Sequence, residues 1–399
     1  MFEHLQPLPA DPILNLMVQY RQDTNPNKVD LGVGVYKDEA GNTPIMAAVT
    51  EAEKIILATE TTKSYIGPAG AEGFNHHVSR LLLGNQHSVL SDQRLAIAQT
   101  PGGCGALRMA AEFVAKCRSD VTVWVSTPTW ANHIPLLQGA GLTIAEYPYF
   151  DKDTKGVQFD AMMDMLSNQT KAGDIVLLHG CCHNPSGADL SREQWDAVAA
   201  LCVEKGLMPF VDIAYQGLGD GLEEDAYGLR KLADTVPEML IASSCSKNFG
   251  LYRERTGAVM VLAASAEQAK ISGSLLFSTI RGHYSMPPAH GAAIVETILS
   301  NEKLTQMWDT ELTEMRQRIL QLRHALADQI AAAGCEQSFA FIPEQKGMFS
   351  FLGISKEQVA RLRDEYSIYM VDSSRVNIAG LNSSNLDYVA QSLTNVLKG

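Results

Sequence analysis

The sequence lacks a long apolar run, an N-terminal targeting pattern and an excess of positive charge. No apolar stretch is long enough to span a bilayer, and the opening MFEHLQPLPADP has no basic region followed by an apolar core. Lysine and arginine number 32 against 45 aspartate and glutamate residues, so the net charge is −13. Such a chain is a poor partner for nucleic acid and for anionic membranes. We therefore expect a cytoplasmic protein that binds neither, with small molecules as its partners.

Cysteine is present, but not in a pattern that builds disulfides or a metal site. The seven cysteines are odd in number and scattered, and Cys181 and Cys182 are adjacent. This usage is typical of reduced thiols inside a cell. Cys181, Cys182 and His183 could suggest a metal site, but no second pair of ligands stands at zinc spacing. We expect no metal.

The chain does have ample apolar material, 46% of 399 residues, which suffices for one large domain and a smaller one. From residue 94 onward, strand and helix patterns alternate, and Ser191 with Gln194 forms a capping box. We predict strands at 121–125, 142–146, 175–179, 209–213 and 239–243, and helices at 106–116 and 194–204. The fold class is therefore α/β, a mostly parallel sheet flanked by helices, with ligands beyond the carboxyl ends of the strands.

The remaining segments predict a smaller α+β domain. Residues 29–38 alternate as a strand does, and apolar spacing predicts a long helix at 302–333 that ends at Gly334. Short strands are expected at 347–352, 368–371 and 375–378, and a final helix near 384–397. We place an extended arm at 1–12, the small domain at 13–44 and 313–399, and the large domain at 45–312.

The stretch Ser243–Arg255, SSCSKNFGLYRER, is the strongest candidate for chemistry. It follows the buried strand at 239–243 and places Lys247 among hydroxyls, with Arg255 further on. A lysine in such a setting is favoured as a neutral amine that can attack an aldehyde. Two alternatives stay open, a solvated loop lysine and a serine acyl-enzyme built on Ser244 and Lys247 through the Ser-x-x-Lys pattern.

Other polar residues fall on the loops after the strands. Glycines at 102, 103 and 105 precede a helix, which suits an anion, although an ordinary turn would look the same. Trp130 could stack on a planar ring, with His133 as a supporting partner or a structural histidine. Asn184 precedes Pro185 in a polar turn.

The strand that begins at residue 209 ends in Asp212-Ile-Ala-Tyr215. A carboxylate inside an apolar run needs a cationic or N–H partner, and a protonated ring nitrogen would serve. Tyr215 could then donate a hydrogen bond to a phenolate oxygen on the same ring. Together these groups describe a site for pyridoxal phosphate: an anion cradle, an aromatic ring, an acid, a phenolate-binding pair and an amine.

The chain closely resembles the class I aminotransferases of the aspartate and aromatic amino acid group, of the bacterial type. The motifs are LGVGVYKDEAGNTP, QTPGGCGALR, HGCCHNPSGADL, DIAYQG, SSCSKNFGLYRER and IRGHYSMPPAHG, and the likeness runs from residue 10 to RVNIAG at 375–380. The resemblance implies a pyridoxal phosphate fold of type I. It also implies a homodimer with shared active sites that acts on amino acids and 2-oxo acids.

The same resemblance implies roles for single residues. Lys247 would form the imine with the cofactor and move the proton from Cα, and Asp212, supported by His133, would hold the ring nitrogen protonated. Asn184 and Tyr215 would bind the phenolate oxygen, and Trp130 would stack on the ring. The phosphate would be bound by Gly102, Gly103, Cys104, Ser244 and Arg255, joined by Tyr65 from the other subunit. The substrate would meet Gly34, Trp130, Asn184 and Arg375 at its α-carboxylate, and Arg281 and Met286 at its distal end.

Substrate choice rests on a few positions. Ser64, Cys104 and Met286 depart from the aspartate-preferring pattern, whereas Val35, Lys37 and Thr43 match it. A thioether at 286 is adaptable and favourable to aromatic rings. We therefore predict dual specificity for aromatic amino acids and for aspartate and glutamate, with 2-oxoglutarate or oxaloacetate as acceptor. The alternative is a strict aspartate aminotransferase.

Two rivals belong to other classes of protein. A serine acyl-transfer enzyme would need Ser-Asp-Asn and Lys-Thr-Gly partners, and neither string occurs. A pyridoxal-binding regulator would need a DNA-binding module. The two predicted domains take up the full length of the chain, and its acidic composition also disfavours DNA binding.

Overall fold

The computed structural model describes residues 2–7, 12–118 and 120–398. The chain divides into two compact units, unit 1 (Met1–Thr43 with Arg318–Gly399) and unit 2 (Pro44–Gln317). Of the predicted arm, residues 2–7 contain a turn but no helix or strand, Pro12 already begins a helix, and residues 1 and 8–11 lie outside the described residues. Within the described ranges, no helix is both long and apolar enough to cross a membrane.

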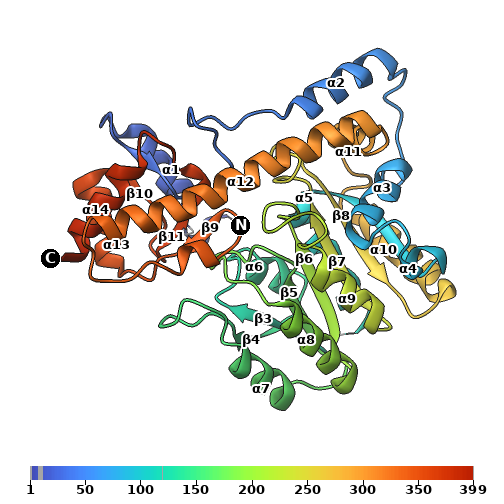
Figure 1. The fold of residues 1–399 in the computed structure, drawn as a ribbon. Helices are drawn as coiled ribbons and strands as arrows, with labels where there is room; N and C mark the ends of the chain where they lie inside the picture. The colour runs from blue at the N-terminus through green and yellow to red at the C-terminus, as the bar shows by residue number, and fades with distance from the viewer. Residues whose placement is uncertain (1, 8–11, 119, 399) are drawn as a thin grey trace. The chain divides into compact units, whose positions relative to one another are not determined.

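Unit 2 is built on a seven-stranded sheet with the order β2-β8-β7-β6-β5-β3-β4 (Figure 1). The strands are β2 Leu95–Pro101, β3 Thr122–Thr127, β4 Thr143–Pro148, β5 Ile175–His179, β6 Met208–Ile213, β7 Met239–Ser244 and β8 Thr256–Leu262. All run parallel except β8, which is antiparallel to both β2 and β7. The predicted mostly parallel sheet is confirmed, with β2 and β8 as strands that the sequence interpretation missed.

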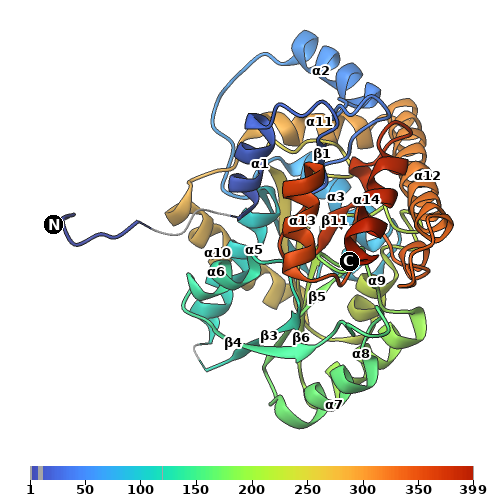
Figure 2. The ribbon, with the colours of Figure 1, turned by 90° about the vertical axis from the view of Figure 1, so that its left-hand side faces the viewer.

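Helices cover both faces of this sheet (Figures 1 and 2). On one face lie α5 Gly102–Cys117, α6 His133–Gln138 and α10 Ala266–His283, and on the other lie α7 Phe159–Gln169, α8 Arg192–Lys205 and α9 Tyr227–Thr235. The remaining helices of the unit are α2 Ala47–Thr59, α3 Glu72–Leu83, α4 Ser88–Ser91 and α11 Ala289–Leu299. The predicted capping box of Ser191 and Gln194 opens α8.

Coverage on both faces explains the composition of the central strands. Every residue of β7 and of β8 is buried, so these strands are apolar along their length instead of alternating. Polar and glycine residues are therefore concentrated where the strands end, and this places the candidate site at the edge of the sheet.

Unit 1 joins residues from both ends of the chain. Its elements are α1 Pro12–Gln22, β1 Val29–Asp30, η1 Ile342–Glu344, β9 Phe349–Phe351, α13 Lys356–Tyr366, β10 Ile368–Tyr369, β11 Arg375–Asn377, η2 Ile378–Gly380 and α14 Leu386–Lys398. Strand β1 pairs parallel with β10, and β9 pairs antiparallel with β11. The long helix α12 Glu302–Ala332 begins in unit 2 and ends in unit 1, and Gly334 follows it with a φ of 74°.

The predicted strand at 29–38 is wrong beyond its second residue. The Asp30 carboxylate accepts hydrogen bonds from the backbone N–H of Gly32 at 3.0 Å and of Val33 at 3.3 Å. These bonds turn the chain, so β1 ends at Asp30 although the apolar alternation continues. Of the four residues expected on one buried face, Val29 and Leu31 are buried while the two later valines are only partly buried.

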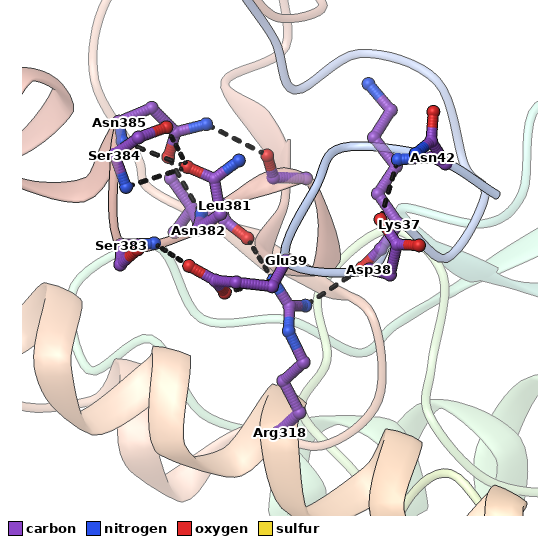
Figure 3. A network of polar contacts seen from close by, with 11 residues as sticks. Lys37, Asp38, Glu39, Asn42, Arg318, Leu381, Asn382, Ser383, Ser384 and Asn385 are labelled. Atoms are coloured by element: carbon purple, nitrogen blue, oxygen red, sulfur yellow. Dashed lines mark hydrogen bonds and ion pairs between the residues drawn. The ribbon is translucent and has the colours of Figure 1, made fainter. Parts of the chain in front are cut away.

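A polar network connects the N-terminal and C-terminal segments of unit 1 (Figure 3). The Arg318 guanidinium donates to the carbonyl oxygens of Lys37 at 2.9 Å and Leu381 at 2.8 Å, and pairs with Glu39 at 3.2 Å. The other carboxylate oxygen of Glu39 accepts from the Ser383 N–H at 2.7 Å. One arginine thus joins two segments that lie far apart in the sequence.

Candidate active site

The predicted site residues of unit 2 gather because the strand ends meet at one edge of the sheet. The parallel strands β2, β3, β5, β6 and β7 all end there, and the antiparallel β8 begins there. The glycines at 102 and 103 follow β2, Trp130 follows β3, Asn184 follows β5, Asp212 and Tyr215 mark the end of β6, Lys247 follows β7, and Arg255 precedes β8. Sheet topology therefore brings together residues from across much of the chain.

A cavity of about 250 Å³ opens at this edge. It is lined by Gly103, Cys104, Leu107, Trp130, His179, Cys181, Asn184, Asp212, Ala214, Tyr215, Ser244, Ser246, Lys247 and Arg255. Nine of the predicted site residues are in this set: Gly103, Cys104, Trp130, Asn184, Asp212, Tyr215, Ser244, Lys247 and Arg255. All the lining residues belong to unit 2.

One end of the cavity is suited to an anion. The glycine turn is the first turn of α5, whose N-terminal N–H groups and helix dipole favour negative charge. The Arg255 guanidinium lies over Gly102, because a Cβ on that glycine would stand 2.4 Å from Nη2. The hydroxyls of Ser244 and Ser246 are 3.0 Å apart beside the same turn. A phosphate fits these donors.

The other end of the cavity presents a carboxylate backed by a buried histidine. Nε2 of His133 lies 3.0 Å from Oδ2 of Asp212, and its Nδ1 lies 2.8 Å from Oγ1 of Thr129. His133 is completely buried and so does not line the cavity itself. A protonated ring nitrogen would satisfy an acid held in this way.

Two further histidines lie beside His133. The ring centre of His179, which is partly buried, is 5.1 Å from that of His133 and 4.1 Å from that of the buried His183. Burial, together with the charge that His133 can carry, lowers the pKa of His179 to about 3, despite the opposing effect of Asp212. Burial likewise holds the pKa of His183 well below its usual value. Both side chains are therefore neutral at physiological pH.

An amine and an aromatic ring complete the cavity. The Lys247 amine lies 5.0 Å from the centre of the Tyr215 ring. Trp130 meets His133 edge to face with ring centres 5.3 Å apart. Asn184 is buried and joined to Pro185 by a cis peptide bond. A planar ring with a phosphate, a basic nitrogen and an aldehyde therefore matches the donor set, which is the chemistry of pyridoxal phosphate.

The predicted substrate-binding residues Gly34 and Arg375 lie in unit 1. Arg375 is buried in β11, where it donates to the Gly32 carbonyl at 2.7 Å and its guanidinium lies 4.3 Å from the Phe349 ring. The same ring packs against Gly34, because a Cβ there would meet it at 2.8 Å. Within unit 1 these two residues thus share one aromatic neighbour.

Besides Gly102 and His133, three predicted residues of unit 2 do not line its cavity. Tyr65 is 94% exposed, and Arg281 is exposed near the end of α10, where it donates to the Ser285 hydroxyl at 2.6 Å. Met286 is half-buried and follows shortly after. None of the three is among the residues that line the described cavity, so the chain's own cavity does not test their predicted roles.

Sequence reasoning missed five residues of the cavity wall. Leu107, His179, Cys181, Ala214 and Ser246 line the cavity, although none was proposed for the site. Ser246 directly precedes Lys247, and His179 is the last residue of β5, so position at a strand end was a usable signal for both. Nothing in the apolar residue types themselves distinguished Leu107 or Ala214 from ordinary core.

The model of the family "Aminotransferase class I and II" matches residues 26–393. The chain belongs to the class I and II aminotransferases. It is 49% identical to the aspartate aminotransferase of Escherichia coli over 397 residues, covering 100% of both chains. It is also 46% identical to the aromatic-amino-acid aminotransferase of Paracoccus denitrificans, covering 99% of this chain and 100% of the relative.

Solved aminotransferase structures share this fold. The aromatic-amino-acid aminotransferase of Burkholderia pseudomallei, which is covalently bound to pyridoxal phosphate, matches with a TM-score of 0.97 and 42% identity over 100% of this chain and 99% of that one. The predicted family and fold class are confirmed. The serine acyl-transfer alternative finds no support among these aminotransferases.

Proposed function

We propose that the protein is a pyridoxal phosphate-dependent aminotransferase that moves the amino group between amino acids and 2-oxo acids. Its preferred donors are aromatic amino acids together with aspartate and glutamate, and the acceptors are 2-oxoglutarate or oxaloacetate. One observation carries the proposal. A single cavity holds a lysine amine, a histidine-backed carboxylate and an anion cradle at the edge of one sheet.

The cofactor, when bound, supplies an aldehyde for the substrate nitrogen and a ring that accepts electrons from Cα. Asp212 holds the proton on the ring nitrogen, and His133 orients Asp212 through the bond at 3.0 Å. Asn184 and Tyr215 would bind the phenolate oxygen, and Trp130 would stack on the ring. The groups around Gly102, Gly103, Cys104, Ser244 and Arg255 hold the phosphate.

Lys247 acts as the general base of the reaction. Its Nζ takes the proton from the substrate Cα. Arg375, with the Gly34 backbone, binds the α-carboxylate as a bidentate fork. In this assignment Arg281 meets the distal carboxylate of a dicarboxylic substrate.

The dual preference rests on the wall of the distal pocket. Relatives with similar identity are named as aspartate and as aromatic-amino-acid aminotransferases, so overall identity does not choose between them. Met286 offers a flexible thioether that packs against an aromatic ring or withdraws from it. The alternative, a strict aspartate aminotransferase, is favoured by Val35, Lys37 and Thr43.

The same proposal includes the assembly and the domains. We propose a cytoplasmic homodimer in which Tyr65, Arg281 and Met286 reach the site of the other copy, because the chain's own cavity does not include them. The predicted boundaries, at residues 44 and 312, are proposed as the limits of the large domain.

Two experiments test the function. Lys247→Ala should reduce kcat by about 10²- to 10⁴-fold, whereas Lys116→Ala on the exposed surface of α5 should leave it unchanged. Borohydride reduction of the loaded enzyme should add the cofactor's mass to the peptide that contains Lys247. Turnover by Lys247→Ala at the wild-type rate would remove the assignment of the base.

Specificity is tested by comparing kcat/KM for phenylalanine, tyrosine and aspartate with 2-oxoglutarate as acceptor. Values of similar size for the aromatic and the acidic donors support the dual reading. A preference for aspartate of about a thousandfold, equal to roughly 4 kcal/mol of transition-state binding, would establish the strict aspartate enzyme instead.

A further inference from the structure

Two stretches of unit 2 carry the residues that the cavity leaves out. Tyr65 stands just before the turn that closes between Gly67 and Gly70, and Arg281 and Met286 lie on the segment that leads to Pro288. These stretches are far apart in the sequence and neither lines the described cavity. If both stretches contribute to one site in another copy of the chain, a contact within this chain must fix their positions relative to each other.

Gln99 is the residue that connects them. Its Oε1 accepts from the N–H of Ala71 at 3.0 Å, and its Nε2 donates to the carbonyl of Pro288 at 2.6 Å. Its backbone N–H donates to the Ala69 carbonyl at 2.9 Å. Because one end of the amide faces an N–H and the other a C=O, its orientation is determined by its partners.

The same residue belongs to the strand that leads into the cofactor cradle. Gln99 lies in β2, which ends at Pro101, and the Thr100 hydroxyl donates to the Gly102 carbonyl at 3.0 Å. Gln99 is therefore attached to three segments at once: the Tyr65 stretch, the Arg281–Met286 stretch and the glycine turn of the chain's own cavity.

Packing around this glutamine leaves little freedom. Its side chain is completely buried, and a Cβ on Gly70, which has a φ of 80°, would stand 2.3 Å from the Gln99 Cβ. The Asn75 amide adds a second bond to the Ala69 carbonyl at 2.8 Å. Loss of the Gln99 amide would remove the hydrogen-bond partner of the Ala71 N–H and of the Pro288 carbonyl, both of which are in part-buried bonds.

We propose that Gln99 is a positioning residue that holds the Tyr65 stretch and the Arg281–Met286 stretch together, so that a neighbouring copy receives a phosphate ligand and a distal-carboxylate ligand as one preassembled surface. This inference rests on the proposed function, and it adds a residue that touches neither cofactor nor substrate. Its action is through the backbone at Ala71 and Pro288.

The test uses the full-length enzyme loaded with pyridoxal phosphate and two variants. Gln99→Leu removes both side-chain hydrogen bonds. We expect its dissociation constant for pyridoxal phosphate, measured by equilibrium dialysis, to rise about tenfold, because Tyr65 is displaced in the neighbouring copy. At saturating cofactor, kcat/KM for aspartate should fall about tenfold relative to that for phenylalanine, because only aspartate needs Arg281.

Gln99→Glu distinguishes positioning from a general loss of stability. The introduced carboxyl group, when protonated, can donate to the Pro288 carbonyl and accept from the Ala71 N–H, and burial raises the pKa of such a group. The cofactor affinity and the aspartate-to-phenylalanine ratio of this variant should return toward wild type as the pH is lowered. The Gln99→Leu defects, measured against wild type at each pH, should not recover.

Gln158→Leu is the matched control, because Gln158 is a part-buried glutamine of the same unit whose amide donates to the Phe150 carbonyl at 3.0 Å. It should change neither quantity. The inference is overturned if folded Gln99→Leu keeps both within about twofold of wild type. Should Gln99→Leu not fold, the absence of pH-linked recovery in Gln99→Glu overturns it. If the wild-type enzyme is inactive with both donors, the proposed function is refuted instead. The dissociation constants for pyridoxal phosphate of the Gln99 variants then still test the role of Gln99.

Discussion

At the scale of the residue, the anion end of the cavity contains a thiol. The Cys104 sulfur lies in the first turn of α5 and accepts a contact from the Asn132 amide at 3.6 Å. A thiol is a weak hydrogen-bond donor compared with a hydroxyl. If Cys104 binds the phosphate as proposed, the phosphate receives a weaker contact here than a threonine would provide.

Cys104→Thr should tighten cofactor binding. A hydroxyl in place of the thiol adds a stronger donor, so we expect the dissociation constant for pyridoxal phosphate to fall by about three- to tenfold. Equilibrium dialysis measures it. Cys117→Thr, at the exposed far end of the same helix, is the control and should have no effect. Unchanged or weaker binding by Cys104→Thr would show that the sulfur does not contact the phosphate.

The lowered pKa values of His179 and His183 predict how stability depends on pH. In the folded chain the pKa of His179 is about 3 and that of His183 lies well below 6.5, so below pH 6.5 the unfolded chain binds more protons. The free energy of unfolding should therefore fall as the pH drops from 7.5 to 5.5, by about 1.4 kcal/mol for each histidine. Burial raises the pKa of Asp189 to about 6. The folded chain therefore takes up a proton at Asp189 as the pH falls through 6, and this contribution raises the free energy of unfolding and offsets part of the loss from the histidines.

His183→Gln isolates one of these contributions. Urea unfolding at both pH values should give a pH-dependent loss that is about 1.4 kcal/mol smaller in the variant than in wild type, whatever its absolute stability. His324→Gln, at an exposed position, should reproduce the wild-type difference. An unaltered pH-dependent loss in His183→Gln would mean that His183 takes up its proton in the folded protein.

The places of the candidate residues at strand ends were easier to predict than their surroundings in space. The acid, amine and anion cradle could be assigned because each stands where a strand ends, and strand ends were readable as apolar runs followed by polar residues. His133 was expected as a support of Asp212, and it lies within hydrogen-bond distance of that carboxylate. Its complete burial could not be predicted, because burial depends on α6 packing against the sheet.

At the scale of the element, the parallel strands were predictable and the antiparallel and irregular ones were not. Five strands gave clear signals because continuous apolar runs alternate with helical periodicity. The run TGAVMVL of β8 was equally apolar but was missed, because no helical periodicity separates it from β7 as it separates the parallel strands. At Asp30 a side-chain carboxylate ended β1, which no periodicity reveals.

Arg318 provides a test of how unit 1 is held together. Arg318→Met keeps the aliphatic stem but removes the bonds to the Lys37 and Leu381 carbonyls and to Glu39 (Figure 3). We expect a loss of about 1–3 kcal/mol of unfolding free energy, measured by urea denaturation. Lys356→Met, which breaks an exposed pair with Asp372, is the control and should cost less than about 0.5 kcal/mol. Equal losses in the two variants would contradict a special role for Arg318.

At the scale of the whole molecule, the exposed apolar residues near the start of unit 2 bear on assembly. Ile45 is 70%, Leu57 is 87% and Tyr65 is 94% exposed. Large apolar side chains gathered along one stretch are typical of a surface that another chain covers. No feature of the sequence alone separates such residues from core positions, because apolar patterning is the same in both.

Leu57→Asp should disrupt the proposed dimer. A charge in a buried interface carries a desolvation penalty of several kcal/mol, so sedimentation should show a shift toward monomer. Cofactor affinity should fall with it, because Tyr65 would no longer reach a second copy. Val203→Asp, at an exposed valine on α8, is the control and should leave both unchanged. A Leu57→Asp protein that sediments as wild type would place the interface elsewhere.

The antiparallel direction of β8 restricts the length of the connection that precedes it. Since β7 leaves the sheet at the same edge at which β8 re-enters it, residues 245–255 form a hairpin connection that carries both Lys247 and Arg255. Both strands are wholly buried, so neither can slide to absorb an insertion or deletion in this connection. A change in the length of this connection would therefore have to be absorbed within residues 245–255, where it would displace the amine and the cation together.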